Sequence, residues 1–247
     1  MKKISWLVIL FLSIFNIAQA KIIEVDYKVE FGIMGEIGVA HAKLTRDNSS
    51  FVIDIRLQST GLAKILSGNR RERHISKGHI ENGIMVSDLY QIIKSHGSKT
   101  SDRVYHIDHN KKKVTRIDEK YKNGKLYKKR TKVMDTYSKD DLLTLYFNLN
   151  SYIKDKNSSK DYRFHAVGAE IQKGFVDVHI PNSSELSEYK EMLGDNSSSW
   201  YARVIVNQKI FSSDKGELML RIGKDGITQK AVLKDLIFFG DIRAFQI

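Results

Sequence analysis

The chain of 247 residues contains no cysteine and only one proline, Pro181. Without cysteine, neither a disulfide nor lipid attachment through a cysteine is available, so the fold must rest on its hydrophobic core. No stretch rich in proline and glycine separates the chain into parts, which predicts one domain rather than two. Beyond the N-terminus, no apolar run approaches the ~20 residues that a membrane-spanning helix needs.

The N-terminus has the layout of a secretory signal peptide. Two lysines precede an apolar run from Ile4 to Ile17, and Ala18-Gln19-Ala20 ends the segment with small residues. This arrangement predicts cleavage after Ala20, whereas an uncleaved anchor is disfavoured because the run is too short to span a bilayer. The lysine-rich start is typical of a bacterial precursor. We therefore expect a cleaved signal peptide at 1–20 and a single β-rich periplasmic domain at 21–247.

The charge of the chain is strongly positive. Lysine and arginine outnumber aspartate and glutamate by 41 to 29, which gives a formal net charge of +12. The signal peptide carries two of the lysines, so the exported chain retains +10. Export argues against nucleic acid as the partner of this basic protein, and it favours anionic lipid, lipopolysaccharide or an acidic protein.

Alternation of apolar and polar residues dominates the exported chain. From Ile23 to Phe31 every second side chain is apolar, and Phe51 to Leu57 repeats the pattern. A period of two predicts strands with one buried and one wet face, and the pairs Asn82-Gly83 and Asn123-Gly124 predict hairpin turns. Further strands are predicted at Arg73 to Ile80, Met85 to Ser95, Arg103 to Ile107, Lys113 to Asp118, Lys125 to Met134, Tyr162 to Ala169, Phe175 to Ile180, Trp200 to Gln208, Glu217 to Ile222, Thr228 to Leu236 and Phe238 to Phe245. The pattern indicates an antiparallel meander.

One segment, Ser138 to Leu149, predicts a helix. Ser138 followed by Asp141 is a variant of the capping box, and the apolar side chains cover about 200° of the helix surface at 100° per residue. Thr144 and Asn148 occupy the narrow polar side. So wide an apolar arc favours a helix embedded in a sheet over one that inserts into a membrane or docks a partner. A shorter segment, Gly61 to Leu66, is predicted as either one helical turn or a bent connection.

The order of these segments resembles a bacterial exported family known as domain of unknown function 3108. The resemblance spans most of the exported chain and rests on "YKVEFGIMGEIGVAHAKL", "STGLAK", "HIENGIMVSDLY", "DDLLTLYFNL" and the last 32 residues, from Gly216. The matching landmarks are Gly38, Gly61, Asp141, Leu142, Tyr146 and the closing Phe239-Gly240-x-Ile242. The chain departs from the family pattern at Val86-Ser87, where that pattern has a proline.

This resemblance implies a periplasmic β-rich domain similar to the curved half-barrels of lipoprotein carriers, and it implies no activity. Together with the strand pattern, it predicts a mainly β fold. We expect a strongly curved antiparallel sheet, a half-barrel or open barrel, with one helix packed in its concave side.

Motifs of the common enzyme classes are missing from the sequence. It contains no nucleophile elbow, no metalloprotease histidine pair and no phosphate-binding glycine loop. His106, Asp108 and His109 have the close spacing of metal ligands, but three lysines follow them and no further ligand lies nearby, so a solvated turn is favoured. Capping explains the pair Asp140-Asp141 more simply than catalysis does. We therefore predict a protein without enzymatic activity, metal or cofactor.

The leading functional hypothesis is an envelope protein that binds an apolar or amphiphilic ligand, such as a lipid or a lipoprotein acyl chain, between the sheet and the helix. The residues expected to line this cleft are Tyr27, Phe31, Leu142, Leu145, Tyr146 and Leu149. A third and weaker hypothesis is an envelope hydrolase whose acid and base come from distant strands.

The alternative is an interaction or scaffold protein that docks an acidic partner or an anionic envelope surface. Its candidate surface is the basic hairpin, with Lys111, Lys112, Lys113, Lys125, Lys128, Lys129 and Arg130. A solvated face with edge-protecting lysines explains the same pattern.

Overall fold

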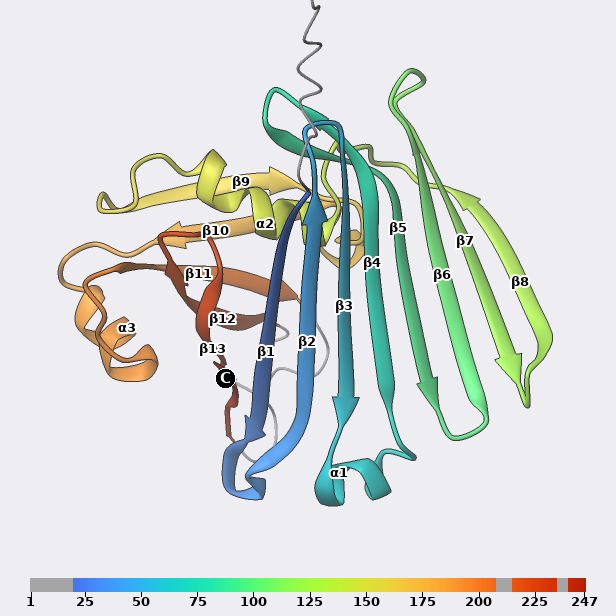
Figure 1. The fold of residues 1–247 in the computed structure, drawn as a ribbon, viewed down its shortest axis with the longest axis horizontal. Helices are drawn as coiled ribbons and strands as arrows, with labels where there is room; N and C mark the ends of the chain where they lie inside the picture. Colours follow the sequence, from blue (N-terminus) through green and yellow to red (C-terminus); the bar gives the residue numbers. More distant parts are fainter. Residues whose placement is uncertain (1–19, 208–214, 235–239) are drawn as a thin grey trace, which may run out of the picture.

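The computed structural model describes residues 20–207, 215–234 and 240–247. In this part of the chain, fourteen strands form one antiparallel sheet in the order β8-β7-β6-β5-β4-β3-β2-β1-β14-β13-β12-β11-β10-β9 (Figure 1). The prediction of a mainly β, antiparallel fold is confirmed. The predicted signal peptide lies outside the described residues except for Ala20, so it stays a prediction.

The first eight strands form a meander of long hairpins that occupies one half of the sheet (Figure 1). The predicted Asn-Gly turns are confirmed, because both residues of Asn82-Gly83 and of Asn123-Gly124 have positive φ. The strands are β1 (Lys21–Phe31), β2 (Glu36–Arg46), β3 (Ser50–Ser59), β4 (Arg71–Glu81), β5 (Ile84–His96), β6 (Lys99–Asp108), β7 (Lys113–Lys122) and β8 (Lys125–Val133).

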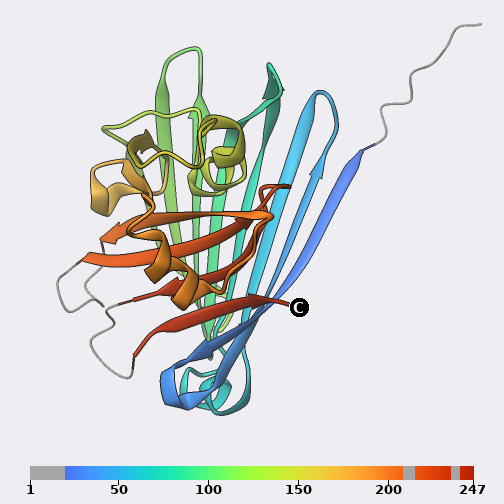
Figure 2. The same cartoon turned by 90° about the vertical axis from the view of Figure 1, so that its left-hand side faces the viewer.

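The remaining strands form the other half of the sheet, and the last strand pairs with the first. Figures 1 and 2 show strands β9 to β12 running across the direction of β1 to β8. These strands are β9 (Lys160–His165), β10 (Phe175–Ile180), β11 (Ser199–Asn207), β12 (Lys215–Gly223), β13 (Thr228–Leu233) and β14 (Ile242–Gln246). The strand predicted at Tyr162 to Ala169 ends earlier, at His165, and the predicted positions Gln208, Leu236 and Phe238 lie outside the described residues.

Within the described residues, three α-helices and two short 3-10 helices connect the strands. They are η1 (Gly32–Met34), α1 (Gly61–Leu66), α2 (Leu142–Tyr152), η2 (Glu170–Gln172) and α3 (Leu186–Leu193). Helix α1 settles the choice that the sequence left open between a helical turn and a bent connection. Helix α3 was not predicted, although Tyr189 and Leu193, four residues apart and both buried, supply an apolar stripe.

Helix α2 begins later than predicted because Asp141, and not Ser138, is its N-cap. The Asp141 carboxylate accepts hydrogen bonds from the backbone N–H groups of Leu143 (2.7 Å) and Thr144 (3.0 Å), and the Thr144 hydroxyl accepts one from the Asp141 N–H. The Ser138 hydroxyl instead donates to the His165 carbonyl, 2.8 Å away. The prediction of Ser138 as the cap is therefore wrong.

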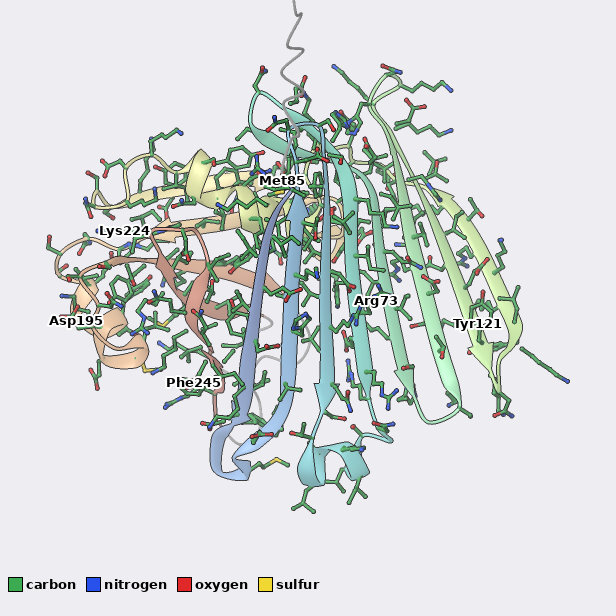
Figure 3. The ribbon with its side chains drawn as sticks, viewed as in Figure 1. Arg73, Met85, Tyr121, Asp195, Lys224 and Phe245 are labelled. Carbon is green, nitrogen blue, oxygen red and sulfur yellow. The ribbon has the colours of Figure 1, made fainter. Side chains whose placement is uncertain are left out.

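The polar side of α2 is buried against strand β5. The Asn148 side chain donates to the Met85 carbonyl at 2.9 Å and accepts from the Met85 N–H at 3.2 Å, so it pairs with the strand as a neighbouring backbone would. Met85, labelled in Figure 3, lies beside the helix. The narrow polar strip thus fastens the helix to the sheet instead of facing water.

The apolar sides of α2 contact both halves of the sheet. Leu143 and Phe147 pack against the cluster formed by Leu44, Phe51, Ile53 and Met85 of β2, β3 and β5. Leu145 and Leu149 belong to the cluster that contains Val178, Ile180, Ala202 and Leu220 of β10, β11 and β12. The two halves of the sheet therefore lie on opposite sides of the helix.

The Asp141 carboxylate also joins the helix to two strands. It is fully buried and accepts hydrogen bonds from the hydroxyls of Ser76 on β4 and Ser87 on β5, the latter at 2.6 Å. Burial raises the pKa of Asp141 to about 6, although its hydrogen bonds favour the ionised form. Burial also raises the pKa of Asp140, which accepts from Asn148 and Tyr152.

We predict that Asp141→Ala destabilises the fold by roughly 3 kcal/mol or more. The change removes the cap, worth about 1 kcal/mol, and leaves two buried serine hydroxyls without their acceptor, at about 1–3 kcal/mol each. Urea unfolding measures the loss. Asp141→Asn keeps an acceptor for the helix and should cost less.

Wild type and Asp141→Asn together test the raised pKa. The folded state holds the Asp141 proton up to about pH 6 and the unfolded state only up to about pH 4, so wild-type stability falls as the pH rises through this window. The amide in Asp141→Asn does not titrate, so the difference in unfolding free energy between the two proteins should change by on the order of 3 kcal/mol between about pH 3.5 and 7.5. A difference independent of pH would contradict the assignment.

Candidate functional site

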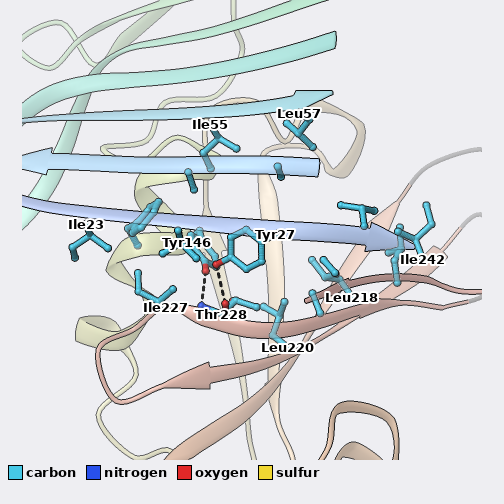
Figure 4. A pocket seen from close by; sticks show the side chains of 18 residues that line it. Ile23, Tyr27, Ile55, Leu57, Tyr146, Leu218, Leu220, Ile227, Thr228 and Ile242 are labelled. Carbon is cyan, nitrogen blue, oxygen red and sulfur yellow. Dashed lines mark hydrogen bonds between the residues drawn. The ribbon is translucent and has the colours of Figure 1, made fainter. Parts of the chain in front are cut away.

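An apolar cavity of about 420 Å³ lies between the two halves of the sheet, beside helix α2 (Figure 4). Strand β1 contributes every second side chain from Ile23 to Val29, as its period of two requires. Opposite them lie side chains of β12, β13 and β14, among them Leu218 and Ile242, while Tyr146 and Phe147 of α2 close one side. Of the described residues that line the cavity, none is charged.

Small side chains create the space. Ala40 and Ala42 on β2 line the cavity from one wall, and Ala231 and Ala244 line it from the other. Ala231 of β13 and Ala244 of β14 are direct partners in the sheet, so two methyl groups stand side by side where larger side chains would fill the volume. Protein side chains normally pack without voids, so these four alanines leave a volume that the protein's own side chains do not fill.

The polar groups in the wall are two tyrosine hydroxyls and a threonine. The Tyr27 hydroxyl donates to the Thr228 carbonyl at 2.8 Å, and the Tyr146 hydroxyl accepts from the Thr228 N–H at 2.9 Å (Figure 4). Burial raises the pKa of both tyrosines, so both are neutral at ordinary pH. The hydroxyls satisfy the backbone of β13, and the rest of the wall is apolar.

A second cavity of about 250 Å³ adjoins the first. Tyr146, Leu218 and Leu220 line both, so these three side chains are the partition between them. The second cavity lies between α2 and strands β10 to β12, with the η2 segment along it.

Five of the six side chains predicted for the cleft line one of the two cavities. Tyr27 and Tyr146 line the first, and Leu142, Leu145, Tyr146 and Leu149 line the second. Phe31, the last residue of β1, is part of neither lining. The sequence pattern did not identify the wall of the first cavity that β12, β13 and β14 form. The available signal was the alternation of Leu218 and Leu220 and the small side chains of Ala231 and Ala244.

The predicted basic residues share one ribbon but form no single cluster. Lys111, Lys112 and Lys113 lie at the β6–β7 turn, whereas Lys125 follows the turn at the opposite end of β7. Lys128, Lys129 and Arg130 lie along β8, an edge strand whose nine residues are all exposed. Lys129 forms an ion pair with Glu119 across the ribbon at 2.8 Å.

The structure also separates the histidines that the sequence placed together. The Asp108 carboxylate accepts from the Lys111 N–H at 2.9 Å, as expected of a turn, and His106 is exposed. His109 lies instead beside His79 and Asp88, two residues that the sequence spacing did not connect with it.

Comparison with known proteins shows little sequence relationship. No family model matches the chain and no curated protein matches it. The resemblance to domain of unknown function 3108 thus finds no support. A crystal structure of a "beta-barrel-like protein of domain of unknown function DUF1849" from Brucella abortus is similar in fold, with a TM-score of 0.49 and 9% identity over 91% of this chain and 94% of that chain. Among the helices that the structure describes, none has the length and apolar character to cross a membrane.

Proposed function

We propose that this protein binds an apolar or amphiphilic ligand, such as a lipid or a lipoprotein acyl chain, in the cavity between the sheet and helix α2. The observation that carries the proposal is an uncharged cavity of about 420 Å³ walled by aliphatic side chains and alanines. Its volume lies within the ~300–1,000 Å³ range of sites for small molecules. Burial of a methylene group is worth about 0.8 kcal/mol, so a chain of about ten methylenes would gain roughly 8 kcal/mol, which is of the same order as the cost of its immobilisation.

The partition at Tyr146 suits an extended ligand. A chain that enters the first cavity meets the Tyr146 ring, and beyond the ring lies the second cavity with Leu145 and Leu149 on α2. The proposal includes a sheet that is curved into a half-barrel or open barrel, with α2 in its concave side. It also places the protein in the periplasm, after removal of its signal peptide. The similarity to a β-barrel-like protein gives no information about the ligand.

We propose a non-enzymatic role, and the chemistry of the described lining supports it. Its polar groups are the Tyr27 and Tyr146 hydroxyls, which bond the backbone of Thr228, and the Thr228 hydroxyl. The described lining offers no pair of groups that could serve as acid and base. The two carboxyls of Asp140 and Asp141 bond to neighbouring side chains and the start of α2. A hydrolase therefore has the weakest geometric support.

Docking of an acidic partner by the basic ribbon remains the alternative. Lys111 to Lys113 and Lys125 lie at opposite ends of that ribbon, so a partner would have to contact its full length. Edge protection explains the charges of β8 without a partner, because lysine on an exposed edge strand prevents pairing with another chain.

We predict that Ala40→Phe, which fills the cavity, lowers the affinity for an apolar fluorescent probe such as a polyene fatty acid at least tenfold. The matched control is Val39→Phe, since Val39 is the adjacent residue of β2, is 39% exposed and is not part of the lining. Probe titration measures the affinities, and thermal unfolding checks that each variant is folded. Ala231→Leu adds a smaller side chain to the opposite wall, and it should weaken binding if Ala40→Phe does not fold.

Native mass spectrometry of the protein from its own host complements the titration. A ligand of one copy per chain that disappears on organic extraction is the expected result. Wild-type protein that carries no ligand and binds no apolar probe, or Ala40→Phe protein that binds as tightly as Val39→Phe, would overturn the proposal.

A further inference from the structure

A β-bulge in β5 places Asp88 close to His79 of β4 and to His109 of the β6–β7 turn. The register passes from Lys77 opposite Leu89 to Gly78 opposite Ser87, so Asp88 is the extra residue of β5. Glycine is required at position 78, because a Cβ atom there would lie 1.9 Å from the Val86 carbonyl oxygen. The bulge therefore depends on Gly78 of β4 and on the extra residue Asp88 of β5.

Three metal-ligating side chains converge at this bulge. The Asp88 carboxylate lies 3.0 Å from His79 Nδ1 and 3.1 Å from His109 Nε2, and one nitrogen or oxygen from each residue lies within 4.8 Å of the others. Neighbouring ligand atoms in a tetrahedral shell with bonds of about 2.0–2.2 Å are roughly 3.3–3.6 Å apart. Small rotations of these side chains would therefore accommodate a cation.

Both ring nitrogens of His109 have hydrogen-bond partners. One of them, Nδ1, lies 2.9 Å from the Tyr137 hydroxyl. His109 Nε2 lies 2.9 Å from the Ser87 carbonyl and 3.1 Å from the Asp88 carboxylate, so Nε2 carries the proton as long as no metal is bound. A cation would replace this proton, and Nδ1 could then carry one and donate it to the Tyr137 hydroxyl. Nearby, Lys139 pairs with Glu81, so the lysine charge is compensated.

We propose that His79, Asp88 and His109 bind a divalent transition-metal cation, with zinc as the best match, and that water completes the coordination. Two imidazoles and one carboxylate suit zinc, nickel or copper, whereas magnesium and calcium prefer shells of oxygen alone. The cation would join β4, β5 and the β6–β7 turn. The site also lies next to the attachment of α2, because Asp88 follows Ser87, whose hydroxyl bonds the N-cap of that helix. This site is separate from the apolar cavity.

Calorimetric titration of the protein without a histidine tag tests the site with zinc chloride. We expect one zinc per chain, no displacement by millimolar magnesium, and at least tenfold weaker binding in Asp88→Asn and in His79→Gln. His41→Gln is the matched control, because His41 Nδ1 also contacts an aspartate, Asp26, at 2.7 Å but without a second histidine.

Thermal unfolding supplies a readout that does not depend on calorimetry. Zinc should raise the Tm of wild type and of His41→Gln but not that of Asp88→Asn. Absence of zinc binding by folded wild type, or an equal loss in His41→Gln, would overturn the assignment.

A second and independent observation concerns the edge of the molecule at helix α1. Leu62, Ile65 and Leu66 are 74%, 76% and 77% exposed, and their spacing places them on one face of the helix. The Thr60 N–H bonds the Ile37 carbonyl, so α1 lies against the start of β2 and near the η1 turn, where Met34 is also exposed. An apolar group of this kind on a protein surface marks a contact with a partner or a membrane.

Basic residues are frequent at the end of the sheet where α1 lies. The backbone bonds from Gly97 to Gly68 and from Asn123 to Ser98 tie α1 and the next two turns into one edge, at the bottom of Figure 1. The basic residues at or beside these turns are Lys64, Arg70, Arg71, Lys94, Lys99, Lys122 and Lys125. Two carboxylates offset only part of this charge: Glu72 pairs with Arg70 and Lys94, and Glu36 accepts from the Thr60 hydroxyl at the start of α1.

We infer that this edge docks on an anionic lipid bilayer. The three apolar side chains of α1 would enter the headgroup region while the lysines and arginines meet lipid phosphates. Charge decides between occupants, because two copies of so basic an edge would repel each other. Leu57, in the strand that leads into α1, lines the apolar cavity, so the edge adjoins one end of that cavity. Transfer of lipid from the membrane to the cavity rests on the proposed function, but the docking does not.

The absence of cysteine allows a direct test. Leu62→Cys or Leu66→Cys, labelled with an environment-sensitive fluorophore, should shift to shorter wavelength with vesicles of phosphatidylglycerol and phosphatidylcholine but not with phosphatidylcholine alone. Val52→Cys is the control, since Val52 is exposed on β3 away from α1. High salt should reverse the shift.

Flotation with the same vesicles measures docking without a label. Leu62→Ser combined with Leu66→Ser should reduce bound protein at least tenfold, while binding of the fatty-acid probe in free solution stays unchanged. No spectral shift at positions 62 and 66, or a shift equal to that at position 52, would overturn the docking site. If wild type does not bind the fatty-acid probe, the proposed function of the cavity is overturned, whereas the docking result is unaffected.

Discussion

The polar attachment of helix α2 to strands β4 and β5 is the constraint on which the rest of the structure depends. The Asn148 side chain forms hydrogen bonds with the N–H and the carbonyl of Met85. The Asp141 carboxylate accepts hydrogen bonds from the Ser76 and Ser87 hydroxyls and also caps the helix. Apolar packing alone is non-directional and would tolerate rotation of the helix. Buried hydrogen bonds allow little rotation, because a displaced partner leaves a buried polar atom without a hydrogen bond. The helix therefore has one orientation.

That orientation determines what each side of the helix meets. With Thr144 and Asn148 against β4 and β5, Leu145 and Leu149 point toward β10 to β12, and Tyr146 reaches the Thr228 backbone on β13. The two halves of the sheet are thereby held apart by the width of a helix. Beyond the helix nothing in the described residues fills the gap, and the alanines of β2, β13 and β14 leave it open as an apolar cavity.

Local patterns in the sequence predicted most of the elements. The period of two predicted the strands, the Asn-Gly pairs predicted two hairpin turns, and the apolar arc predicted α2. The cap of α2 was assigned wrongly because Ser138 and Asp141 both suit an N-cap, and local sequence does not show that the Ser138 hydroxyl bonds His165 instead. The buried role of Asn148 was missed because a polar side chain on a helix gives no sign of a partner 63 residues away.

The sequence by itself determined the strands, their alternating faces, the hairpins and a helix too apolar to stand in water, since these depend on neighbours along the chain. It also determined the strong positive charge and the absence of disulfides. Only the tertiary structure decided which strands face each other across α2, because Tyr27 and Thr228, which share the cavity wall, are 201 residues apart. It likewise brought His79, Asp88 and His109 together and spread the basic residues along a ribbon. Contacts between distant residues follow from sheet register and helix orientation, and both are set by packing of the whole chain.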